Sequence, residues 1–127
     1  MGTLNPRLWQ RLRRAAEEEV EAVLRTLPAP LRQRARNIPV TFETLPGDDL
    51  VQDGIADDTM GLFVGGDYVA VLEDPIPAQI ILFLENIWEY ADRETDVYLD
   101  EVRRTLLHEL GHYLGLDEDE LGERDLD

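Results

Sequence analysis

The order of patterns along the 127-residue chain predicts an α+β domain, with helices packed on one face of a small mixed sheet. A run with helical spacing of apolar residues comes first, short β-like runs fill the middle, and a second helical pattern follows late in the chain. We expect a single domain over residues 1–127, because a chain of this length buries roughly two-thirds of its unfolded surface. It contains no cysteine, so no disulfide is needed or available.

The first predicted helix begins at Asn5-Pro6, since proline is favoured in the first turn of a helix. It ends before the Pro28-Ala29-Pro30 sequence, after about twenty residues. Its apolar residues recur at helical spacing and are Leu8, Leu12, Ala15, Ala16, Val20, Val23, Leu24 and Leu27. Residues 31–37 are expected to add a short turn of helix.

Three strands are predicted, at residues 38–43, 60–65 and 79–84, where β-branched and aromatic residues are frequent. Residues 68–72 could form a further short strand or an extended connection. Residues 46–58 are rich in Gly and Asp, and their acids lack the spacing of a calcium-binding EF-hand. We therefore expect a solvated loop there.

The last predicted helix runs from about Asp100 to Leu114 and stops at Gly115, with Asp96 or Asp100 as its cap. A shorter helical segment is expected before it, at residues 85–91. Residues four or three apart give the last helix one apolar face, made of Val102, Leu106, Leu110 and Tyr113.

The net charge of −16 is unevenly distributed. Residues 1–37 contain eight Arg against four Glu, whereas residues 38–127 contain four Arg against 24 acids. An acidic body of this kind argues against nucleic-acid binding, which needs clustered cations. We expect the basic N-terminal segment to face the acidic body, and a partner protein is the alternative.

The first fourteen residues contain four Arg and no apolar stretch typical of a signal peptide. No apolar run approaches the ~18 residues that a membrane span requires. The expectation is a soluble, cytoplasmic protein without membrane partners.

The strongest functional signal is the H-E-x-x-H sequence His108-Glu109-Leu110-Gly111-His112. Residues four apart on a helix lie on the same face, so both imidazoles can reach one metal ion. Glu109 is turned roughly 100° round the helix from His108. This position suits a general base that holds a water molecule, and it suits a third metal ligand less well. The alternative is a solvated stripe of polar residues that binds no metal.

The composition restricts the remaining ligands of such a site. Without cysteine, and with both histidines already in the motif, a third protein ligand must be Asp or Glu. Gly115 can adopt the positive φ that often ends a helix. The chain can turn there and bring the acids of residues 117–120 back toward the metal.

The full pattern over residues 108–118, H-E-x-x-H-x-x-G-x-x-carboxylate, resembles that of the zincin metallopeptidases. More narrowly, the chain resembles the small single-domain zincin-like metallopeptidases, or minimal zincins, over residues 60–121. The likeness includes Gly61-Leu62-Phe63 and the sequences at 77–83 and 101–105. It implies a zincin-like fold with a C-terminal metal-binding helix and Zn²⁺ as the cofactor.

The resemblance also implies the third ligand, Glu118, beside His108 and His112. The family usually has Asp at the position of Glu118, so Asp119 is the alternative ligand. No Met follows residue 60, so the Met-containing turn beneath the metal of larger metzincins is missing.

The activity implied by the resemblance is zinc-dependent hydrolysis of peptide bonds, with Glu109 as general base toward water. An extended peptide or protein substrate would pair with an edge strand, formed by residues 60–64 or 80–84. Tyr68, Tyr90 and Tyr98 are candidates for stabilising the oxyanion, although each fits a packing role better. The competing hypothesis is a non-catalytic metal-binding or protein-interaction module, whose metal site is structural or idle.

Overall fold

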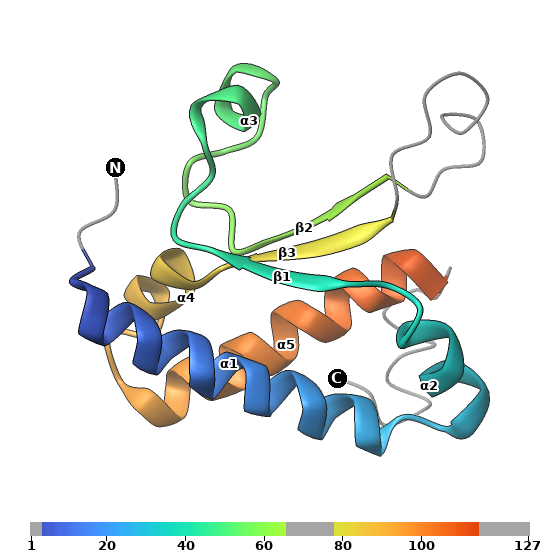
Figure 1. Cartoon of the computed structure of the whole chain (residues 1–127). Helices are drawn as coiled ribbons and strands as arrows, with labels where there is room; N and C mark the ends of the chain where they lie inside the picture. The colour runs from blue at the N-terminus through green and yellow to red at the C-terminus, as the bar shows by residue number, and fades with distance from the viewer. Residues whose placement is uncertain (1–3, 66–77, 115–127) are drawn as a thin grey trace.

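The computed structural model describes residues 4–65 and 78–114, and its elements form the predicted α+β arrangement (Figure 1). A three-stranded mixed sheet lies across two long helices that cover one of its faces. The elements in chain order are α1 (Pro6–Thr26), α2 (Ala29–Ala35), β1 (Val40–Glu43), α3 (Asp48–Gln52), β2 (Gly61–Val64), β3 (Gln79–Phe83), α4 (Leu84–Tyr90) and α5 (Thr95–Leu114).

Helix α1 has the boundaries that its sequence predicts. The Asn5 side chain accepts a hydrogen bond from the Leu8 backbone N–H at 2.8 Å, which satisfies one of the free donors of the first turn. The helix ends before Pro28. Its apolar face is buried in the core through Leu12, Ala16, Val20, Val23 and Leu24.

The sheet has the strand order β1-β3-β2. Strand β3 pairs in parallel with β1 and antiparallel with β2, so both of its edges are occupied and the sheet is mixed. Ile80 and Leu82 of β3 alternate onto the helix-covered face and are fully buried. Within residues 4–65 and 78–114, strands β1 and β2 are therefore the two edges of the sheet.

Helix α5 packs on α1, β2 and β3 and supplies much of the core. Val102, Leu106 and Leu110 of its predicted apolar face are buried, while Tyr113 is half-buried. Near its start, Tyr98 is fully buried and donates a hydrogen bond to the Leu12 carbonyl of α1 at 2.8 Å. This bond ties the first half of α5 to α1.

The predicted start of the last helix is wrong, because α5 begins at Thr95. Asp96 lies in its first turn, where a negative charge is favoured by the helix dipole, and so does not cap it from outside. Asp100 lies further inside and forms an i,i+4 ion pair with Arg104 at 2.9 Å. The predicted stop at Gly115 lies outside the described residues.

The predicted loop at residues 46–58 contains the short helix α3, which the sequence interpretation missed. Asp48 and Asp49 occupy its first turn, a position that favours acids. Residues 68–72, where a further strand was considered, lie outside the described residues. Among the described residues, no helix is both long and apolar enough to cross a membrane.

Three arginines of the basic N-terminal segment, at positions 13, 25 and 36, form ion pairs with acids of the same segment. Arg13 pairs with Glu17 at 3.2 Å, and Glu21 accepts from both Arg25 and Arg36 at 3.5 and 3.0 Å. Two of these pairs are i,i+4 neighbours on α1, so they form without any tertiary contact.

Candidate metal centre

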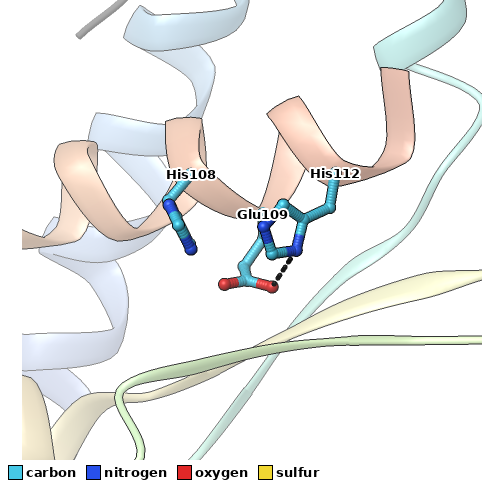
Figure 2. Close-up of side chains that lie close together, drawn as sticks. All are labelled: His108, Glu109 and His112. Atoms are coloured by element: carbon cyan, nitrogen blue, oxygen red, sulfur yellow. Dashed lines mark ion pairs between the residues drawn. The ribbon is translucent and has the colours of Figure 1, made fainter. Parts of the chain in front are cut away.

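His108, Glu109 and His112 lie together on the last turns of α5 (Figure 2). Their potential ligand atoms all lie within 4.8 Å of one another, and the two imidazole ring centroids are 4.6 Å apart. The helix therefore brings both histidines to one point, as their i,i+4 spacing predicts. This geometry argues against a polar stripe whose members point apart.

The burial of the three side chains differs. His108 and His112 are exposed, whereas Glu109 is only 8% exposed and extends between the helix and the strands. Glu109 Oε1 lies 3.8 Å from His112 Nδ1, which is an ion pair only if the imidazole is protonated. The acid thus stands beside both imidazoles while its stem packs against the protein.

The donor set fits a zinc ion. Zinc binds imidazole nitrogen and carboxylate oxygen at about 2.0–2.2 Å in a tetrahedral arrangement, so two of its ligand atoms stand about 3.5 Å apart. The ligand atoms of the three residues lie within 4.8 Å of one another, and both histidines are exposed, so their rings can rotate toward that spacing. Exposed donors also suit an open catalytic site better than a structural one, whose four positions are filled by protein.

The third ligand that the resemblance implies, Glu118, lies outside the described residues, as does its alternative Asp119. Their assignment stays a prediction. Within residues 4–65 and 78–114, the group that could hold a metal consists of His108, Glu109 and His112.

Strand β2 runs beside the metal-binding part of α5. At one end, a methyl group in place of the Gly61 hydrogen would overlap Thr105 and lie 3.4 Å from Glu109 Cγ. At the other end, the Phe63 and Tyr113 rings pack edge to face with centroids 5.7 Å apart. The edge of β2 thus borders the metal site, whereas residues 80–84 belong largely to the central strand β3 and have no free edge over residues 80–83.

The three tyrosines considered for the oxyanion have different positions. Tyr98 is excluded, because its hydroxyl is fully buried against α1 and burial raises its pKa. Tyr90 lies on α4 and is 64% exposed. Tyr68 lies outside the described residues.

The sequence interpretation proposed residues 60–64 as a substrate-binding strand, but it did not predict how Gly61 and Phe63 of that strand pack on α5. A glycine inside a strand can mark a close approach of another backbone or helix, and Gly61 carried that signal. The pairing of Phe63 with Tyr113 has no local sequence signal, because it joins residues fifty positions apart.

One helix of this α+β domain presents two histidines and a glutamate in the H-E-x-x-H spacing. A helix of this kind is typical of metalloproteases. The family of zincin-like metallopeptidases matches residues 35–127, well over half of the chain. The chain is a member of the zincin-like metallopeptidase family. No curated protein matches the sequence.

Proposed function

We propose that this protein is a zinc-dependent peptidase that cleaves extended peptide segments. The observation that carries the proposal is the convergence of His108, Glu109 and His112 at one open point of α5. Membership of the metallopeptidase family supports the same chemistry. The nitrogen and oxygen donors favour zinc among the common catalytic metals.

Zinc bound by His108, His112 and Glu118 would polarise the scissile carbonyl and make a bound water more acidic. Glu109 has the position to accept a proton from that water, since its carboxylate lies beside both imidazoles. The same carboxylate can then deliver the proton to the leaving amine. Its stem is buried, which limits the orientations that the carboxylate can adopt.

Substrate binding is proposed at the free edge of β2. A peptide paired there, as in other cases of strand addition, would run alongside α5 from Thr105 toward Tyr113. Strand β1 is the other edge, but it lies on the far side of β3 from β2. The substrate class that follows is a flexible peptide or an unfolded protein segment.

The test compares the zinc-loaded wild type with Glu109→Gln on an unfolded protein and a mixture of fluorogenic peptides. We expect Glu109→Gln to bind one zinc per chain and to lose kcat by about 10²-fold or more, the range for a general base. Glu101→Gln is the matched control, because it makes the same change two turns earlier on α5 and should leave kcat unchanged.

The exposed histidines favour this proposal over the non-catalytic module, whose structural metal would be enclosed by protein. If the wild type binds zinc stoichiometrically but cleaves none of these substrates, the module is the better description. If Glu109→Gln retains the wild-type rate, Glu109 is not the base.

A further inference from the structure

Gly61 stands where strand β2 meets the metal-binding helix. A β-carbon at this position would overlap Cγ2 of Thr105 and would lie 3.4 Å from Cγ of Glu109 and from Cδ2 of Leu82. The positive-φ glycines of the described chain are Gly54 and Gly65, so Gly61 is not needed for an unusual backbone conformation. The missing side chain of Gly61 leaves space between β2 and α5.

Two residues on one face of α5 lie next to the space left at Gly61. Thr105 and Glu109 are four residues apart, and both are nearly buried, at 9% and 8% exposure. The strand therefore packs on the turn that carries Glu109, so closely that a β-carbon at Gly61 would contact the methylene stem of the Glu109 side chain. The carboxylate end points toward the imidazoles (Figure 2).

The spacing between α5 and β2 also sets the distance between Glu109 and a peptide bound at β2. If a peptide pairs with the free edge of β2, as proposed above, its carbonyl groups are held by that strand, while Glu109 is held by the helix. Any added volume at Gly61 pushes helix and strand apart and moves the base away from the peptide. A misplacement of about 1 Å can lower a catalysed rate on the order of 10²-fold.

We propose that Gly61 is a positioning residue, whose lack of a side chain seats β2 against Thr105 and Glu109 and so sets the distance between the general base and the strand-bound substrate. The inference rests on the proposed peptidase function. Gly61 would act through Glu109, because a β-carbon at Gly61 would meet the stem of Glu109 while the Glu109 carboxylate lies beside the imidazoles.

The experiment uses Gly61→Ala, Thr105→Ser and the double variant. Thr105→Ser removes the Cγ2 methyl that would overlap the new β-carbon and retains the hydroxyl. The control is Gly47→Ala, because Gly47 has φ −72° and nothing lies within 4 Å of a β-carbon there. Each protein is assayed for kcat, KM, zinc affinity and urea unfolding of the metal-free form.

We expect Gly61→Ala to lower kcat at least tenfold with little change in KM. Zinc affinity should stay within twofold, because both histidines move together on α5. Gly47→Ala should keep wild-type kcat, Thr105→Ser should lower it less than Gly61→Ala does, and the double variant should recover most of the activity that Gly61→Ala loses. In unfolding, the two substitutions should couple by at least tenfold in the equilibrium constant, about 1.4 kcal/mol.

Three results would overturn the inference: wild-type kcat in Gly61→Ala, a rise in KM alone, or a double variant no better than Gly61→Ala in both kcat and stability. The unfolding measurements need no catalysis, so an absence of coupling overturns the close packing whatever the protein hydrolyses. An inactive wild type with strong coupling would instead reject the peptidase proposal and retain the contact.

Discussion

The Tyr98 hydroxyl offers a test of how α5 is held to α1. Tyr98 is fully buried, donates to the Leu12 carbonyl at 2.8 Å, and packs edge to face on Trp88 with centroids 5.6 Å apart. Tyr98→Phe keeps the ring and removes one hydrogen bond. The Leu12 carbonyl lies inside α1 and keeps a helical donor, so we expect the free energy of unfolding to fall by about 1 kcal/mol at pH 7.

The difference between the two proteins should change with pH. Burial raises the pKa of Tyr98 above its ordinary value of 10.0, whereas the unfolded chain titrates near that value. The stability linked to this raised pKa is fully present below pH 10 and is lost as the pH rises. Above pH 10 the wild type should lose about 1.4 kcal/mol per pH unit from this group, and Tyr98→Phe should lose none.

These magnitudes predict that the stability curves cross. At pH 11 the loss from Tyr98 reaches about 1.4 kcal/mol, which exceeds the hydrogen-bond contribution of about 1 kcal/mol. The wild type should therefore be the more stable protein at pH 7 and the less stable one near pH 11.

Urea unfolding of both proteins at pH 7, 9, 10 and 11, followed by tryptophan fluorescence, measures the gap. Tyr90→Phe is the matched control, because it makes the same change at a side chain that is 64% exposed. If the difference in free energy of unfolding between the wild type and Tyr98→Phe stays constant from pH 7 to pH 11, the Tyr98 hydroxyl is not buried and un-ionised as described.

Two further predictions concern the metal and the core. Glu118→Gln should weaken zinc binding at least tenfold in equilibrium dialysis while Asp119→Asn leaves it unchanged, and the reverse result would move the third ligand by one residue. Leu106→Ala should lower the free energy of unfolding by about 2–5 kcal/mol in urea, because the Leu106 side chain is fully buried under the sheet, and a loss below about 1 kcal/mol would contradict that placement.

The parts of the fold with local signals were predictable from the sequence. Asn5 and Pro6 mark the start of α1, and the spacing of its leucines and valines marks the buried face. The apolar runs at residues 60–65 and 79–84 predicted β2 and β3 close to their observed bounds. The H-E-x-x-H spacing likewise predicted that two histidines meet on one helix.

The parts that depend on tertiary contacts were not predictable. The placement of β3 between β1 and β2 comes from pairing between distant segments, such as Val40 with Ile80, and leaves no local trace. The first turns of α5, from Thr95, dock on α1 through Tyr98, a long-range contact that the local pattern does not reveal. The role of Gly61 becomes visible only once Thr105 lies above it.

The arrangement of α5 separates the stability of the fold from the presence of a metal. Leu106 and Leu110 are buried in the core, whereas the two imidazoles are exposed and contribute little to it. Zinc fingers differ, because they are unfolded without their metal. If the chain binds zinc as proposed, it would fold first and bind the ion afterwards, so the metal-loaded fraction would follow the zinc supply while the core of the fold formed without it.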